Sequence, residues 1–194
     1  MSKIESNKEC ILREAAVLFS QKGYERTSMR EIAEQVGVSK PAIYYHFSNK
    51  QALFEELITT SFNMSQKRIG DIANCDCDPL TKLKDLALGL LQSTKLNPDG
   101  ARFMHDLMAG NIRKNIKLDH RNVFKKQEEL FNQILNSGKD QGVIRRDLDN
   151  FTFIMVFIGT LNMFTIGYLK GEITDINEKT TEHIINVLLN GIKN

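Results

Sequence analysis

Apolar residues recur at helical spacing along almost the whole chain of 194 residues. In residues 7–22, for example, Ile11, Ala15, Leu18 and Phe19 return every three or four positions, the period of one helix face. The sequence shows no run of alternating β-branched residues bounded by hairpin turns. The pattern therefore predicts an all-α protein of about nine helices, at residues 7–22, 28–36, 40–47 and 50–72, around Leu80–Leu91, Phe103–Met108 and Val123–Leu135, and at residues 148–170 and 178–192.

Residues that start and stop helices mark the first three of these segments. Gly23 is expected to end the first helix as a left-handed cap. Ser28 and Glu31 have the spacing of a capping box, in which the hydroxyl binds an amide and the carboxylate reaches back to the cap. Gly37 permits the chain to reverse, and Ser39 is expected to cap the next helix. The second and third helices are therefore short and joined by a tight turn.

Two helices joined by a short turn that contains glycine form a helix-turn-helix, whose second helix enters the major groove of DNA. On a helical wheel of residues 40–47, Ile43 and Phe47 share the face directed at the protein core. Tyr45 points the opposite way and Tyr44 lies on a flank. The alternative is that both tyrosines pack on the following helix or remain exposed without a partner. The surrounding motif favours DNA as the partner of at least one of them.

The predicted DNA interface includes the exposed face of the helix at residues 40–47 and the hydroxyl, amide and basic groups on either side of it. Lys40 and Lys50 bracket the helix and are expected to meet backbone phosphates. Thr27 and Ser28 place hydroxyls and amides at the start of the second helix, where a phosphate is also favoured. The role of His46 stays open between a phosphate contact and packing at the end of the helix. The full set of predicted DNA-binding residues is Thr27, Ser28, Arg30, Ser39, Lys40, Pro41, Ala42, Tyr44, Tyr45, His46 and Lys50.

The segment from Ile11 to Phe54 contains a series of short motifs: Ala15-Ala16, Gly23-Tyr24, Thr27-Ser28, Ile32-Ala33, Gly37-Val38-Ser39, Tyr44-Tyr45-His46-Phe47, and Lys50 followed by Leu53. With these motifs the segment resembles the DNA-binding domain of the TetR family of bacterial transcriptional regulators. The resemblance implies a homodimer bound to a palindromic operator, usually repressing and released by a small ligand, with a DNA-binding domain at residues 1–50 and an effector-binding and dimerisation domain at 51–194. Pocket and ligand differ among members of the family, so neither can be transferred.

Residues 150–169 carry no formal charge over about the length that spans a membrane. A helix that is apolar on all sides can also be central in a soluble protein. We favour the second interpretation, in which the helix packs on its own domain on one side and on a second copy on the other. The predicted dimer interface consists of two glycines that allow close helix approach and the apolar stripe of the last helix: Gly159, Gly167, Ile184, Val187, Leu188 and Ile192.

Methionines and phenylalanines gather in the predicted helices of the C-terminal part. Most such residues are plain core, but methionine also adapts to irregular apolar ligands. We therefore expect a small, substantially apolar effector among these helices. The candidate ligand-binding residues are Phe103, Met104, Leu107, Met108, Phe124, Phe131, Met155 and Met163.

Charge, cysteine content and the absence of catalytic motifs narrow the possible functions and the expected compartment. The net charge of +2 is too small for binding DNA by bulk charge alone, so a shaped surface must contribute. The N-terminal MSKIESNKEC is polar, which predicts no secretory signal, and the three cysteines predict no disulfide framework, so the cytoplasm is the expected compartment. Cys75 and Cys77 are expected in a solvated loop, because a lone Cys-x-Cys supplies too few metal ligands. No catalytic motif, metal cluster or cofactor fingerprint occurs, which predicts neither an enzyme nor a bound cofactor.

The sequence therefore predicts a ligand-responsive, sequence-specific DNA-binding regulator, a repressor acting as a homodimer on double-stranded operator DNA and not at a membrane. The alternative is a helix-turn-helix protein without an effector, which acts through DNA occupancy and protein contacts alone.

Overall fold

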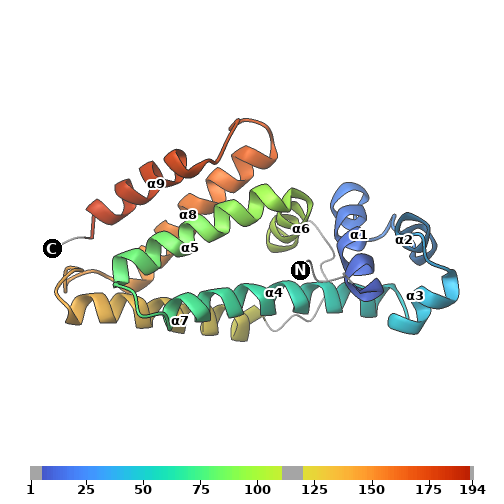
Figure 1. The fold of residues 1–194 in the computed structure, drawn as a ribbon, viewed down its shortest axis with the longest axis horizontal. Coiled ribbons are helices and arrows are strands. Elements are labelled where there is room, and N and C mark those ends of the chain that lie inside the picture. Colours follow the sequence, from blue (N-terminus) through green and yellow to red (C-terminus); the bar gives the residue numbers. More distant parts are fainter. Residues whose placement is uncertain (1–5, 111–119, 193–194) are drawn as a thin grey trace. The chain divides into compact units, whose positions relative to one another are not determined.

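The computed structural model describes residues 6–110 and 120–192, and within these ranges it contains helices and no strands. This confirms the predicted all-α class. Figure 1 shows the helices in chain order: α1 (Asn7–Lys22), α2 (Met29–Val36), α3 (Lys40–His46), α4 (Lys50–Ala73), α5 (Pro79–Leu96), α6 (Pro98–Met108), α7 (His120–Asp140), α8 (Asn150–Leu169) and α9 (Glu178–Asn190).

The described residues divide into two compact units. The first is built from Met1–Asn63 and Asp99–Lys117, and so contains α1, α2, α3, the start of α4, and α6. The second is built from Met64–Pro98 and Leu118–Asn194, and contains the rest of α4 with α5, α7, α8 and α9. The predicted domain boundary at residue 50 stays a prediction.

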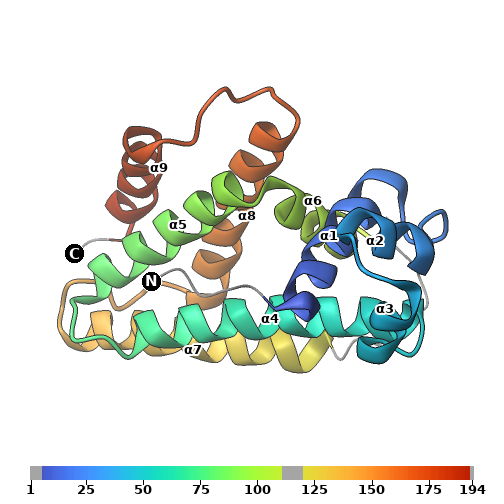
Figure 2. The same ribbon diagram turned by 45° about the vertical axis from the view of Figure 1, so that its right-hand side comes forward.

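In the first unit, α2 packs against α1 and α3 against α2 (Figure 2). The predicted capping box at the start of α2 is present, with Ser28 as N-cap and Glu31 bonded back to it. Gly37 has φ 78° and ψ 26°, the left-handed conformation that allows the chain to turn from α2 toward α3. Gly23 also has positive φ, at 80°, but its ψ of 161° lies outside the left-handed helical region. The cap predicted at Gly23 is therefore of a different type, because the chain leaves α1 in an extended direction.

Four aromatic rings occupy the core of the first unit. The ring of Phe19 on α1 lies 5.1 Å from that of Phe54 on α4, and Tyr24 lies 4.7 Å from Phe54, both edge-to-face. Phe103 on α6 adds a third edge-to-face contact with Phe54, at 5.6 Å. Edge-to-face aromatic pairs of this kind stabilise beyond the area that they bury.

In the second unit, α5 contacts α7, α8 and α9, and α7 contacts α8 (Figure 1). Gly138 and Gly167 allow loop side chains to approach α7 and α8 closely. A Cβ at Gly138 would lie 2.5 Å from Cδ1 of Ile144, and one at Gly167 would lie 2.7 Å from Cδ1 of Ile173. The buried residues of this core are Ala73, Leu83, Leu86, Ala87, Leu91, Phe131, Ile134, Leu135, Ile144, Phe153, Ile154, Phe157, Leu161, Ile176, Ile184, Ile185, Leu189 and Ile192.

The loop between α4 and α5 departs from the sequence prediction. A disulfide joins Cys75 to Cys77, where the sequence predicted unpaired cysteines in a solvated loop. The tight turn brings the two Cα atoms to 5.5 Å, inside the range that a disulfide spans. Within the described residues, no three His, Cys, Asp or Glu side chains gather as a metal site.

Candidate nucleic-acid interface and effector pocket

Helix α3 has one narrow buried face. Ile43 and the C-cap residue Phe47 are buried, whereas Lys40 and Pro41 are exposed and Ala42 is half-buried. Ser39 caps the helix by accepting a hydrogen bond from the amide of Ala42, at 3.3 Å. The side chains therefore point as the helical wheel indicates, and the exposed surface is small near the start of the helix.

The two tyrosines supply the large side chains of that exposed surface. Tyr45 is 85% exposed and Tyr44 is 43% exposed. The ring of Tyr45 touches only the edge of the half-buried His46 ring, with centroids 5.2 Å apart, among the ring contacts of the described residues. Packing of Tyr45 on α4 is thus excluded by its exposure in this structure. Its contact with DNA stays a prediction.

Two other predicted DNA contacts, Ser28 and Arg30, are at the surface but already have partners. The Ser28 hydroxyl accepts a hydrogen bond from the amide of Glu31 at 3.2 Å. Arg30 forms an ion pair with Glu34 at 2.7 Å, and this hydrogen bond raises the pKa of the guanidinium. Only Nε of Arg30 donates to Glu34, so its other N–H donors stay available, and its contact with DNA stays a prediction.

Thr27 and Lys50 have different surroundings from those predicted. Thr27 is 2% exposed, and its hydroxyl donates to the carbonyl of Gly23 at 2.9 Å. The Lys50 ammonium donates to the carbonyls of Tyr24, Glu25 and Thr27 at 2.8, 3.2 and 2.9 Å. An ammonium has three N–H donors, so these bonds use all of them. The chain that leaves α1 needs donors for its carbonyls, and both side chains serve this need. The predicted hydroxyl contact of Thr27 with DNA is corrected to a role in the fold, and Lys50 holds the same loop.

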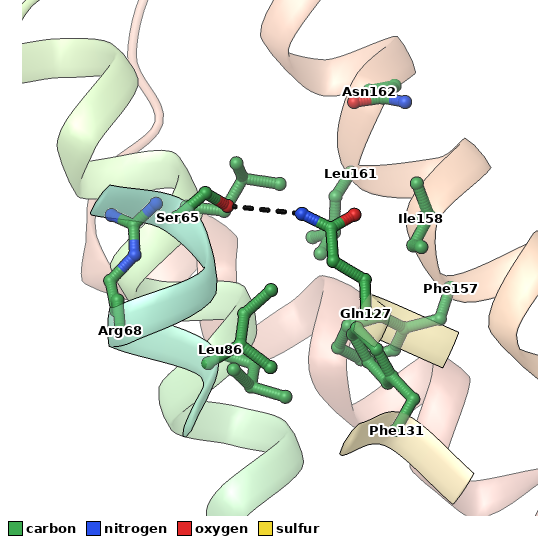
Figure 3. A pocket seen from close by; sticks show the side chains of 11 residues that line it. Ser65, Arg68, Leu86, Gln127, Phe131, Phe157, Ile158, Leu161 and Asn162 are labelled. Atoms are coloured by element: carbon green, nitrogen blue, oxygen red, sulfur yellow. Dashed lines mark hydrogen bonds between the residues drawn. The ribbon is translucent and has the colours of Figure 1, made fainter. Parts of the chain in front are cut away.

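A second candidate site lies within the second unit, between α4, α5, α7 and α8 (Figure 3). It is a mainly apolar cavity of about 140 Å³. The amide nitrogen of Gln127 donates to the hydroxyl of Ser65 across it, at the long distance of 3.5 Å. The lining residues are Ser65, Arg68, Ile69, Leu86, Leu90, Gln127, Phe131, Phe157, Ile158, Leu161 and Asn162.

Of the predicted effector-binding residues, Phe131 lines this cavity. Two others, Phe103 and Leu107, are buried on α6 in the first unit, where Phe103 packs on Phe19 and Phe54. The four predicted methionines are not among the residues that line this cavity. Met104 is half-buried and Met108 exposed on α6, and Met155 and Met163 are exposed on α8. The side chain of Phe124 lies outside the described residues.

The cavity residues that sequence reasoning missed include Arg68, Ser65 and Gln127. Arg68 follows Ser65 by three positions and Ile69 directly follows it, so it borders the apolar stripe of α4. That neighbourhood is a weak signal, because most arginines beside such a stripe extend into solvent.

Helix α8 buries one side and exposes the other. Phe153, Ile154, Phe157 and Leu161 are buried in the core of the second unit. The exposed side carries large apolar residues, namely Phe151, Met155, Val156 and Met163. Among the described residues, α8 is the one helix long and apolar enough to cross a membrane, a criterion that a core helix also meets.

The predicted dimer residues fall into two groups. Gly159 is exposed, with no atom near a would-be Cβ, and Val187 is 76% exposed. Leu188 is half-buried. In contrast, Gly167 packs on Ile173, and Ile184 and Ile192 are buried inside the protomer. Those three residues are corrected to core positions: Ile173 covers Gly167 on α8, and α9 turns part of its apolar stripe toward α5.

Comparison with known proteins agrees with the helix-turn-helix geometry. The model of a family described as bacterial regulatory proteins, tetR family, matches residues 11–57. The nucleoid occlusion factor SlmA of Vibrio vulnificus (strain YJ016) is 33% identical over 141 residues, 71% of this chain and 71% of that protein. The HTH-type transcriptional repressor KstR2 of Mycobacterium tuberculosis (strain H37Rv) is 26% identical over 150 residues, 76% of this chain and 74% of that protein.

Solved structures share the fold along nearly the whole chain. The ketosteroid transcriptional regulator KstR2 of Mycobacterium tuberculosis has a TM-score of 0.76 at 20% identity, covering 99% of this chain and 97% of that one. The regulator FadR of Bacillus subtilis, in complex with stearoyl-CoA, has a TM-score of 0.72 at 19% identity, covering 94% and 98%. The molecule is therefore a helix-turn-helix regulator of transcription. The chain belongs to the TetR family of bacterial regulatory proteins.

Proposed function

We propose that this protein is a repressor that binds a palindromic operator as a homodimer and releases it when a small, substantially apolar effector enters the cavity of the second unit. The observation that carries the DNA-binding part is Tyr45, which is 85% exposed on a short helix capped by Ser39. A tyrosine offers a flat apolar ring and a hydroxyl that reaches base edges or phosphates. Lys40, Pro41 and Tyr44 extend the same exposed surface.

The dimer part of the proposal is supported by the exposed side of α8. We define the α8 outer face as Phe151, Met155, Val156, Gly159 and Met163, and add Val187 of α9 to the proposed interface. Exposed apolar side chains at successive turns of one helix suit burial against an identical helix. This face therefore supports a homodimer, and a two-fold symmetric dimer matches the symmetry of a palindromic operator.

The effector part is supported by the cavity and by one similar structure with a bound molecule. FadR of Bacillus subtilis is described in complex with stearoyl-CoA, which has a long apolar chain. The alternative is a DNA-binding protein without an effector, which would require no cavity. The cavity of about 140 Å³ between α4, α5, α7 and α8 favours the ligand-responsive form.

The test begins with recovery of genomic fragments bound by the purified protein, followed by footprinting. We expect an inverted repeat whose half-site centres lie about one DNA turn, or a multiple of it, apart. A compound screen for release of the recovered fragments then tests the effector. Failure to retain any fragment above random DNA would reject the repressor, and a bound operator that no cavity ligand releases would favour the alternative.

A further inference from the structure

Arg68 brings a positive charge to the wall of the apolar cavity (Figure 3). It lies on the part of α4 that belongs to the second unit, and it is half-buried. Its Nη1 donates to the carbonyl of Gly89 on α5, at 3.1 Å. Within the described residues, that bond is its one polar partner, and no carboxylate lies within ion-pair distance.

Most of the hydrogen-bonding capacity of Arg68 is not used within the described residues and is open to solvent or to a ligand. A guanidinium has five N–H donors, and one of them is used here. Burial lowers its pKa, and no neighbouring acid offsets that effect. A partly desolvated charge without a counter-ion is unfavourable, so an anion that reached Arg68 would gain a charge-assisted and bidentate contact.

The packing of α5 holds the guanidinium in place. Gly89 has no side chain, and a Cβ there would lie 3.6 Å from Cδ of Arg68. The aliphatic stem of Arg68 therefore runs directly against the α5 backbone, and the hydrogen bond to the Gly89 carbonyl fixes its end. Less side-chain freedom is then lost when a ligand binds.

The rest of the cavity fits an apolar group next to that charge. Leu86, Leu90, Phe131, Phe157 and Leu161 supply apolar walls. A volume of about 140 Å³ is close to that of an engineered apolar cavity that binds benzene, so one ring or a short acyl segment fits without rearrangement. The long hydrogen bond between Gln127 and Ser65 is easily exchanged for bonds to a ligand head.

We propose that this cavity binds an amphipathic anion, with Arg68 holding a carboxylate or phosphate head and the apolar walls holding the tail. This inference rests on the proposed function only in naming the anion as the effector. Binding itself can be measured on the purified protein without DNA.

The first experiment compares three ten-carbon probes by calorimetry on the wild-type protein: decanoate, decan-1-ol and decyl phosphate. Decanoate should bind about tenfold or more tightly than decan-1-ol, because a hydrogen bond to a charged group is stronger than one to a neutral group. If decyl phosphate binds and decanoate does not, the head is a phosphate. Equal affinity for decanoate and decan-1-ol together with no preference for decyl phosphate, or no binding of any probe, overturns the proposal.

Variants then test whether Arg68 is responsible. Arg68→Gln should weaken the preferred anion by roughly tenfold or more and leave decan-1-ol binding unchanged. Arg68→Lys, which retains the charge, should recover part of the loss. The matched control is Lys67→Gln, which removes the same charge from the exposed neighbour on α4 and should change neither probe. Equal anion binding by Arg68→Gln and wild type overturns the assignment. If Arg68→Gln does not fold, the anion affinity of Arg68→Lys is compared with that of wild type instead.

Operator release is measured separately on the recovered DNA. Loss of anion binding in Arg68→Gln with an unchanged operator affinity supports the inference. A wild-type protein that binds decanoate through Arg68 but retains no operator would reject the proposed function and leave the anion site standing.

Discussion

Helices α3 and α8 both expose large side chains, but the chemistry of those side chains differs. In α3 the exposed residues are Lys40, Pro41, Tyr44 and Tyr45, and one side chain within the helix, Ile43, is fully buried. In α8 both sides are apolar, with Phe157 among the buried residues and Met155 and Met163 among the exposed ones. Both helices bury apolar side chains in the protein, but their exposed surfaces suit two different kinds of partner.

The difference indicates which partner suits each surface. Tyrosine combines an apolar ring with a hydroxyl, and lysine brings charge, so the α3 surface remains soluble alone and suits the wet, anionic groove of DNA. Methionine and phenylalanine on the α8 outer face have no polar group to satisfy. Such residues are typical of a permanent protein interface, which resembles a protein core. The following predictions test this division, from the largest expected effect to the smallest.

Gly159→Leu should break the α8 interface while sparing the protomer. A Cβ at Gly159 meets no atom of its own chain within 4 Å, whereas a leucine there would prevent close approach of a second α8. We expect a monomer by sedimentation at micromolar concentration and operator affinity reduced by about 10²- to 10⁴-fold, because two linked half-sites become independent.

Gly70→Leu is the matched control, since a Cβ at Gly70 on α4 also meets no atom within 4 Å. It should remain dimeric. A dimeric Gly159→Leu protein would show that α8 does not form the interface.

Ile43→Ala should affect stability first. Ile43 is the fully buried residue of α3, and truncation of a buried isoleucine typically costs about 2–5 kcal/mol. Thermal and urea unfolding should show the first unit destabilised, and DNA binding should be lost only in proportion to the unfolded fraction. A variant that melts like wild type but fails to bind would mean that Ile43 acts at the DNA surface.

Lys50→Met should lower stability, which distinguishes Lys50, a residue that holds the loop before α2, from Lys40, a residue of the exposed α3 surface. It removes the donor from three carbonyls of the loop at residues 24–27, and we expect the free energy of unfolding to fall by about 1–3 kcal/mol. The comparison is Lys40→Met, at an exposed position. That variant should keep its stability, weaken binding to all DNA sequences similarly and reduce the salt slope by about one counterion per half-site. If the two variants exchange these behaviours, Lys50 is the phosphate contact.

Tyr45→Ala should leave the fold nearly unchanged and damage DNA binding. Substitutions at exposed positions usually shift stability by less than about 0.5 kcal/mol. Operator affinity should fall by about 1–3 kcal/mol per half-site, the range for a base or groove contact. Thermal melting and operator titration of this variant check both expectations. The operator affinity of Tyr45→Phe shows how much of the loss comes from the hydroxyl. A large drop in melting temperature with normal binding would contradict the assignment.

The N-terminal caps of α8 and α3 should differ in how much their contribution to stability depends on pH. Asp149 caps α8, and hydrogen bonds from the Thr152 hydroxyl and amide hold the pKa of its carboxyl below the usual value. Ser39 caps α3 and does not titrate. Because the folded-state pKa of Asp149 is the lower one, its stabilising effect is present above the unfolded value of about 3.9 and is lost as pH falls through the folded pKa.

Asp149→Ser keeps a capping oxygen but removes this titration. The free energy of unfolding of wild type relative to Asp149→Ser should therefore decline as pH falls from about 5 toward 3. Urea unfolding at several pH values measures the difference, in which the other carboxylates cancel. A difference independent of pH would exclude Asp149 as a titrating cap.

The reliable part of the sequence reasoning concerns interactions between residues close in the chain. Ser28 with Glu31 and Ser39 with the Ala42 amide are contacts over three positions, so the sequence contains both partners. The direction of Tyr45 follows from helix geometry in the same way. Thr27 could not be placed, because its burial depends on the carbonyls of α1 and of the loop that follows it.

The cavity of the second unit depends on packing between helices distant in the sequence, and the sequence prediction includes only Phe131 of its lining residues. A helical stripe identifies a buried face but not where facing side chains leave a space. Helix α8 is the extreme case, because a helix apolar on all sides has no stripe that distinguishes the exposed Met155 and Met163 from the buried residues. Arg68 was overlooked because a charge beside an apolar stripe acquires meaning only when its neighbours on α5 are known.

The small buried face of α3 has a consequence for how such regulators diversify. Ile43 and the C-cap Phe47 anchor the helix, and Ser39 caps it, so the remaining exposed positions contribute little to folding. If Tyr44 and Tyr45 contact DNA as proposed, substitutions there can therefore alter the DNA sequence that is recognised at almost no expense in stability. After gene duplication, a copy of this protein could acquire a new operator through a few exposed substitutions while its scaffold stays intact.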